Sequence, residues 1–322
     1  MKKFFFMAAA ATALFAACNK TEVVYTDGPQ EIAMFAVSNT ATKAPVEGTV
    51  YPDDNMQVAA YLASDTPGNY FDQTKFVKGT GTTYVGSPAQ YWPVTNATIN
   101  FLAVSEAKTS PVTTITFNAT TPASAAKVVL SDNSSAQYDL MYAAGQGVKT
   151  SSTPAAVDMV FKHALSWICF DVKAAEPDKI TVKSITLNGA VYNGTLDLEN
   201  DEYDKTAAYE SVNASVTPSW SSKGDPKNVL VSNANYLCTT SYVSYGTGLL
   251  VVPNAITTAG FTIVYSTGAG DITYTADFTQ PAGGWVAGKK YTYQISFGAL
   301  AEIEINPTVT DWVSGEGETV TL

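Results

Sequence analysis

The stretch Lys290-Tyr-Thr-Tyr-Gln-Ile-Ser-Phe297 decides the fold class, because every second residue in it is aromatic or aliphatic. In an extended chain these four large residues lie on one face, and the polar residues between them lie on the other. Asp271-Ile-Thr-Tyr-Thr-Ala-Asp-Phe278 repeats the alternation, and the segment 261–265 repeats it again. This period of two predicts half-buried strands of antiparallel sheets.

The alternation continues in other parts of the chain. Glu302-Ile-Glu-Ile305 alternates acid with isoleucine, and the segment 179–187 alternates with a slip of phase at Ser184, which predicts a β-bulge. Clusters of Gly, Pro, Asn, Asp and Ser separate these runs, and no convincing helical period follows the N-terminal segment. Many short strands between turns predict an all-β protein built from sheets packed face to face.

A candidate linker divides the chain near its middle. The segment Gly145–Pro154 is rich in Gly, Ser and Thr, and it leaves two halves that are each about the size of one β-sandwich. We therefore expect an N-terminal β-sandwich domain over residues 44–150 and a C-terminal one over residues 151–322.

The N-terminus has the features of a lipoprotein signal peptide. Lys2 and Lys3 form a basic start, and the apolar run Phe4–Ala17 is shorter than the roughly 20 residues that a membrane span requires. Small residues precede Cys18, as lipid attachment and cleavage before a cysteine require. We predict removal of residues 1–17 and a lipid such as palmitate on Cys18. The alternative is an ordinary secretory signal, in which Cys18 has no special role.

The charge and cysteine content of the mature chain limit the classes of partner that it can bind. Loss of Lys2 and Lys3 lowers the formal charge from −11 to −13, and such an acidic surface disfavours binding to nucleic acid. All 18 basic residues are lysines. After Cys18 only Cys169 and Cys238 remain; they either form a disulfide or stay as two buried thiols, and they are too few for a metal cluster.

The chain offers little that would assemble an active site. His163 is its one histidine, with Ser166 nearby, but a serine nucleophile also needs an orienting carboxylate and an oxyanion hole, and no Gly-x-Ser-x-Gly is present. A single histidine is also too few for the usual zinc sites. We expect His163 to be structural, and we expect no catalytic residue, no metal and no cofactor.

The five tryptophans allow two interpretations. They could form a platform that binds sugars, or they could fill the interior of the sheets, where large aromatic residues are common. We favour the core interpretation. The residues in question are Trp92, Trp167, Trp220, Trp285 and Trp312.

Six short motifs, taken in order, resemble those of the fimbrillin family, the subunits of type V pili. Each motif is weak alone, but together they cover nearly all of the mature chain. They are Gln90-Tyr-Trp-Pro93 followed by Ile99-Asn-Phe-Leu-Ala103, Tyr138-Asp-Leu-Met-Tyr-Ala143, Val160-Phe-Lys-His-Ala-Leu-Ser166, Leu249-Leu-Val-Val-Pro253, Trp285-Val-Ala-Gly-Lys-Lys-Tyr-Thr-Tyr293 and Val309-Thr-Asp-Trp312.

The resemblance implies two tandem transthyretin-like β-sandwiches and a precursor that reaches the outer membrane as a lipoprotein. A protease then removes the tether and first strand, residues 18–43, and a strand from a neighbouring subunit replaces the lost one. The product is a cell-surface fimbrium that supports cell adhesion. Its expected partners are other pilin subunits and a host or bacterial surface ligand. The displaced strand carries Ile32, Met34, Phe35 and Val37.

The processing site implied by the resemblance is the bond between Lys43 and Ala44. The family's best-known site has arginine in this loop, and this chain has no arginine. Either a protease that accepts lysine cuts after Lys43, or another enzyme cuts nearby, or the subunit is not processed. The segment 302–322 is strand-like; whether it is free or folded into its own domain distinguishes a stalk subunit from a tip or anchor subunit.

A second function remains open from the sequence. A surface lipoprotein that binds glycans without polymerising would also be a β-sandwich on a lipid tether. It would depend on exposed Trp or Tyr residues. Its discriminating prediction is saturable binding to a polysaccharide, which is lost when exposed Trp or Tyr residues are changed.

Overall fold

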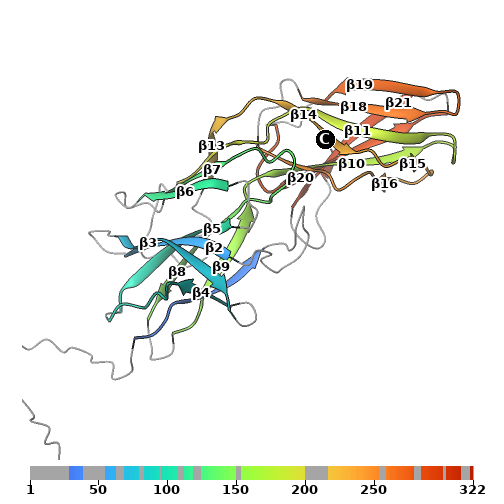
Figure 1. The fold of residues 1–322 in the computed structure, drawn as a ribbon. Helices are drawn as coiled ribbons and strands as arrows, with labels where there is room; N and C mark the ends of the chain where they lie inside the picture. The colour runs from blue at the N-terminus through green and yellow to red at the C-terminus, as the bar shows by residue number, and fades with distance from the viewer. Residues whose placement is uncertain are drawn as a thin grey trace, which may run out of the picture.

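A computed structural model describes residues 29–38, 55–62, 69–79, 83–94, 96–106, 112–118, 125–149, 154–199, 217–253, 259–278, 284–299, 302–312 and 320–321. These residues form strands and connecting turns (Figure 1). No helix that could cross a bilayer is found among them. The predicted signal segment, Cys18, Lys43 and Ala44 lie outside the described residues.

Seven strands close into a barrel in the N-terminal part of the molecule. Their order around the barrel is β1-β4-β3-β2-β5-β8-β9, and β9 returns to pair with β1. The strands are β1 (Ala33–Ser38), β2 (Asn55–Leu62), β3 (Asn69–Lys78), β4 (Thr83–Ser87), β5 (Thr98–Glu106), β8 (Met141–Val148) and β9 (Val157–His163).

A four-stranded sheet covers part of the outside of this barrel. Its order is β13-β12-β7-β6, from β6 (Val112–Asn118), β7 (Ala125–Leu130), β12 (Gly194–Glu199) and β13 (Thr217–Lys223). The sheet explains why β5 is buried on both faces: Phe101 and Ala103 point into the barrel, whereas Leu102 and Val104 pack under β7 and β12. One face of β5 therefore packs in the barrel core, and the other face packs in the core beneath the four-stranded sheet.

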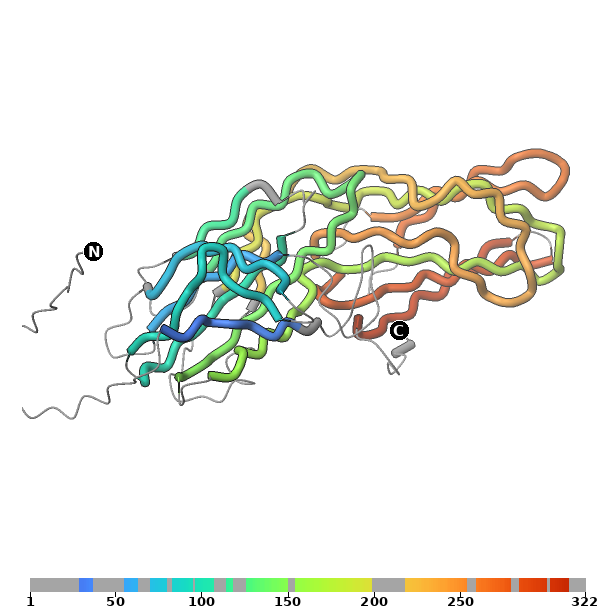
Figure 2. The backbone as a smooth tube through the Cα atoms, turned by 60° about the horizontal axis from the view of Figure 1, so that its bottom comes forward, coloured from blue at the N-terminus to red at the C-terminus, as the bar shows by residue number. Residues whose placement is uncertain are grey.

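The C-terminal part is a sandwich of two sheets (Figures 1 and 2). One sheet contains β16-β10-β20-β21-β22, with β17 beside β10, and the other contains β14-β11-β18-β19, with β15 beside β11. A single apolar cluster fills the space between them. The strands are β10 (Ser166–Ala174), β16 (Val243–Ser244), β17 (Leu249–Val251), β20 (Lys289–Phe297), β21 (Ile303–Asp311), β22 (Val320–Thr321), β11 (Thr181–Ala190), β14 (Lys227–Ser232), β15 (Tyr236–Leu237), β18 (Gly260–Ser266) and β19 (Asp271–Asp277).

The alternation in the sequence is matched by the burial of these strands. The four large residues of β20 are all buried, and Phe261, Ile263 and Tyr265 of β18 are buried opposite them. The predicted bulge is present, because the pairing of β11 with β18 shifts register between Val182 and Ser184. One position differs: Ile272 on β19 is 39% exposed, since it lies beside the turn at the open end of the sandwich.

The sheets do not divide at the predicted linker. β8 takes up Gly145–Val148, the first part of this segment, and pairs with β5. β9 lies beyond residue 151 and still belongs to the barrel, and β12 and β13 join the sheet of β7. The boundary between residues 150 and 151 therefore falls inside the N-terminal unit, and the barrel ends at His163.

The glycines explain why this segment resembles a linker. A Cβ atom on Gly145 would lie 2.5 Å from the sulfur of Met159, and one on Gly147 would lie 2.6 Å from the ring of Trp92. Real Cβ atoms do not approach other atoms so closely. These glycines therefore make room for neighbouring side chains inside the barrel, and they do not serve to make the chain flexible.

Candidate functional site: the β1 seam of the barrel

The first strand closes the barrel with a short alternating sequence. Ile32, Met34 and Ala36 are at most 1% exposed and lie in the barrel core, whereas Phe35 is 37% exposed on the outer face. Phe35, which the sequence analysis predicts as part of the displaced strand, lies in β1 and points away from the core. Val37 lies in the same strand, opposite Val160.

β1 is held on both of its edges by strands that are distant in sequence. It runs antiparallel to β4, from Ala33 opposite Val85 to Phe35 opposite Thr83. It runs parallel to β9, with Met34 opposite Val157 and Ser38 opposite Phe161. Figure 2 shows β1 in blue along one side of the barrel. β1 is therefore the strand that joins the two edges of an otherwise open sheet.

Backbone hydrogen bonds extend this seam beyond the strand itself. The N–H of Ile32 donates to the carbonyl oxygen of Gln90 at 2.7 Å, and the N–H of Trp92 donates to that of Gln30 at 2.9 Å. The Gln90–Pro93 motif thus continues the edge of β4 along β1. A strand in this position satisfies groups on both neighbours, and its loss would leave two open sheet edges.

The histidine, by contrast, lies in a packed joint between the barrel and the sandwich. His163 is 4% exposed, and its Nδ1 lies 2.9 Å from a carboxylate oxygen of Asp139. Its ring stacks on the indole of Trp312, with 3.6 Å between centroids and 7° between planes. Ser166 is fully buried, and its hydroxyl donates to the carbonyl oxygen of Val286. This geometry agrees with the structural role expected for His163.

The stack on His163 continues into the sandwich. Trp167 lies 5.6 Å from Trp312 between ring centroids, and the ammonium of Lys290 lies 4.1 Å from the centroid of the Trp167 ring. We call Asp139, His163, Trp312, Trp167 and Lys290 the joint ladder. Its members come from the barrel and from the sandwich, and Trp312 directly follows β21. The ladder therefore links β21 to the barrel.

The tryptophans are core residues, as the sequence analysis favoured. Trp92, Trp167, Trp285 and Trp312 are at most 7% exposed, and Trp220 is partly buried against the cluster beneath the four-stranded sheet. None of the five forms an exposed platform. The interpretation as a glycan-binding site through tryptophan loses its basis.

The two internal cysteines are buried and form no disulfide. Cys238 belongs to the core of the sandwich, whereas Cys169 faces the cluster shared with the barrel. Burial raises the pKa of the Cys238 thiol to about 11. The choice left open by the sequence is therefore resolved in favour of two separate thiols.

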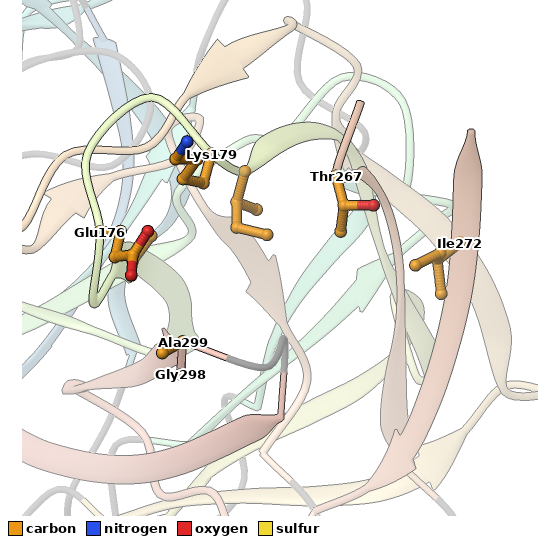
Figure 3. Close-up of a pocket in the computed structure, with 8 residues that line it drawn as sticks. Glu176, Lys179, Thr267, Ile272, Gly298 and Ala299 are labelled. Atoms are coloured by element: carbon orange, nitrogen blue, oxygen red, sulfur yellow. The ribbon is translucent and has the colours of Figure 1, made fainter. Parts of the chain in front are cut away.

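A cavity of about 460 Å³ opens at the far end of the sandwich (Figure 3). Its charged side chains, Glu176 and Lys179, are both exposed and come from the turn between β10 and β11. The cavity is open to solvent at the end of the two sheets, and its charged side chains are not enclosed. Its lining residues are Ala174, Glu176, Lys179, Ile180, Thr267, Ile272, Gly298 and Ala299.

Comparison with known proteins identifies the class of protein that these sheets define. The sequence matches the Fimbrillin-like family over residues 26–312, so the chain belongs to that family. No curated protein matches it. The protein is thus a fimbrial, non-enzymatic structural protein of the cell surface with a role in adhesion, and it assembles with other fimbrial subunits.

Solved structures share the fold at low sequence identity. A candidate cell adhesion protein from Bacteroides uniformis ATCC 8492 is 17% identical, with a TM-score of 0.54 over 88% of this chain and 98% of its own. A fimbrial protein from Bacteroides vulgatus ATCC 8482 is also 17% identical, with a TM-score of 0.52 over 87% of this chain and 99% of its own. Both therefore match the all-β architecture along nearly their full length.

Proposed function

We propose that the protein is a pilin precursor of a type V fimbria, in which proteolysis releases β1 and a strand from a neighbouring subunit replaces it. The observation that carries the proposal is the position of β1. One short strand near the N-terminus closes the barrel, and its partners β4 and β9 are held in place by the rest of the fold.

The physical consequence of releasing β1 supports assembly. Without β1, the interior around Met34 opens to water, and β4 and β9 present unpaired backbone edges. Exposed apolar surface beside open edges favours the addition of a new strand. A strand donated by one subunit to the next is a heterologous contact, which repeats without closing and so produces a filament.

The release step would occur between Lys43 and Ala44. In the sequence this bond lies between β1 and β2, so cutting it removes the covalent link between β1 and the strands that follow it. Since the chain has no arginine, the protease accepts lysine at this position. Cys18 would carry the lipid that holds the precursor at the outer membrane until that cut.

Limited trypsin digestion of the purified precursor tests this proposal. We expect a new N-terminus at Ala44, identified by mass spectrometry, followed by ladders or filaments in electron micrographs and on native gels once fimbrial subunits that can donate a strand are added. The Lys43→Gln precursor is the matched control and should stay monomeric under the same treatment. A chain that starts at Ala44, has lost β1 and remains strictly monomeric with those subunits present would remove the main support for the proposal.

The N-terminus of the protein on cells provides an independent test. A lipidated Cys18 on the unassembled form together with Ala44 on the assembled form is the expected pair. If the assembled form retains Cys18, the subunit assembles without losing β1. The strand-exchange proposal then fails.

A further inference from the structure

We infer that the seam vacated by β1 selects its replacement strand by side-chain volume, and that β21 of a second copy does not meet this requirement. The inference rests on the proposed strand exchange. The replacement would present two large aliphatic residues and then a small one on alternate positions, in the direction of β1. A partner with that pattern, rather than β21 of another copy, would complete the barrel.

The volume requirement follows from the inward residues of β1. Ile32 and Met34 are large and fully buried, and Met34 lies opposite Tyr84 on one side and Val157 on the other. Ala36 lies opposite Met159, which is also fully buried. The inward side chains are therefore large at the first two positions and small at the third, beside the large, buried Met159, and we expect a larger side chain there to overpack the core.

β21 does not fit the narrow position in any register. When β21 runs in the direction of β1 with its apolar face inward, Ile305, Pro307 or Val309 takes the place of Ala36. Each of these side chains is larger than alanine. A further shift places Asp311 there, which would bury a charge in an apolar interior.

β21 is also committed to its own sandwich. It pairs with β20 along its whole length, from Ile303 opposite Phe297 to Asp311 opposite Lys289. Directly after it, Trp312 is 2% exposed and forms the centre of the joint ladder. Withdrawing β21 would break both the sheet and the joint, so a second copy has little freedom to donate this strand.

Strand exchange in the folded chain tests the inference. The full chain carries Cys18→Ser, and a site for a specific protease is inserted within residues 39–50. Cutting the folded protein at this site leaves β1 bound to β4 and β9 without a covalent link to them. Fluorescent peptides of residues 30–38, of residues 30–38 with Ala36→Ile, and of residues 303–311 are added, and fluorescence anisotropy measures their binding. A 30–38 peptide with Met34→Asp is the negative control.

The 30–38 peptide should bind saturably, and the Ala36→Ile peptide and the 303–311 peptide should each bind at least about tenfold more weakly. In a nicked chain with Met159→Ala, the affinity of the Ala36→Ile peptide should return most of the way to that of the 30–38 peptide. Met159→Val is used if the alanine variant does not fold. Binding of the 303–311 peptide as tight as that of the 30–38 peptide would overturn the inference. Failure of the Met159 rescue would overturn selection by volume. Failure of the 30–38 peptide itself would instead overturn the proposed strand exchange.

Discussion

The imidazole of His163 lies flat on the indole of Trp312, with 3.6 Å between the ring centroids, while Asp139, which lies just before β8 of the barrel, contacts its Nδ1. The Asp139 carboxylate lies within hydrogen-bond distance of Nδ1 and so holds the orientation of the ring. The strand β9 ends at His163, and β21 ends one residue before Trp312. The contact therefore joins the last strand of the barrel to the last long strand of the sandwich.

Truncation of this joint should destabilise the whole protein. Trp312→Ala removes a buried indole from between His163 and Trp167, and we expect a loss of about 3–5 kcal/mol in the free energy of unfolding. Chemical denaturation followed by circular dichroism measures it. Trp312→Phe keeps a ring in the stack and should lose clearly less. Equal losses for the two variants would show that stacking is unimportant.

The two faces of β1 should respond differently to truncation. Met34→Ala empties part of the barrel core and should cost about 2–5 kcal/mol. Phe35→Ala, one residue away on the outer face, should cost at most about 1 kcal/mol. Denaturation curves give both values, and hydrogen exchange of the β1 amides locates the effect. A larger loss for Phe35 than for Met34 would contradict the orientation of the strand.

The packing role of Gly147 can be tested by adding one methyl group. Gly147→Ala places a Cβ atom 2.6 Å from the Trp92 ring, so we expect a loss of about 1–3 kcal/mol from overpacking. A flexible linker would tolerate the same change. The double variant with Trp92→Leu should lose less than the sum of the two single changes in thermal denaturation. Additive losses would mean that the two residues do not compete for space.

Alkaline pH should destabilise the protein through its buried thiol. The pKa of Cys238 rises from 9.0 to about 11 because burial disfavours the thiolate. A folded-state pKa above the unfolded value means that the stabilisation is complete below pH 9 and is lost as pH rises through 11. Cys238→Ala should weaken the pH dependence of unfolding in this window. Burial also raises the pKa of Tyr142, to about 12, so part of the pH dependence should remain in the Cys238→Ala variant.

Thiol titration provides the control for that prediction. In the native protein neither Cys169 nor Cys238 should react with an aromatic disulfide reagent at neutral pH, because both are buried. Both should react in denaturant. A native disulfide found by mass spectrometry would contradict the separation of the two thiols into different cores.

The strands whose burial alternates with a period of two could be predicted from the amino-acid pattern alone. The alternation of β20 predicted its buried aromatic face, and the slip at Ser184 predicted the bulge of β11. The sequence also indicated that His163 is structural, because a lone histidine had no partner residues for catalysis in its motif. These properties are local, since each depends on which face of one strand meets the core.

Which strands lie beside one another could not be predicted from the local pattern and is seen only in the folded chain. β1 pairs with β9, and β7 pairs with β12, across long stretches of chain that leave no mark in the local pattern. Gly145 and Gly147 have the composition of a linker, and only the approach of Met159 and Trp92 shows that they pack inside a strand. A small residue leaves space in either setting, and the neighbours that fill this space come from distant parts of the chain.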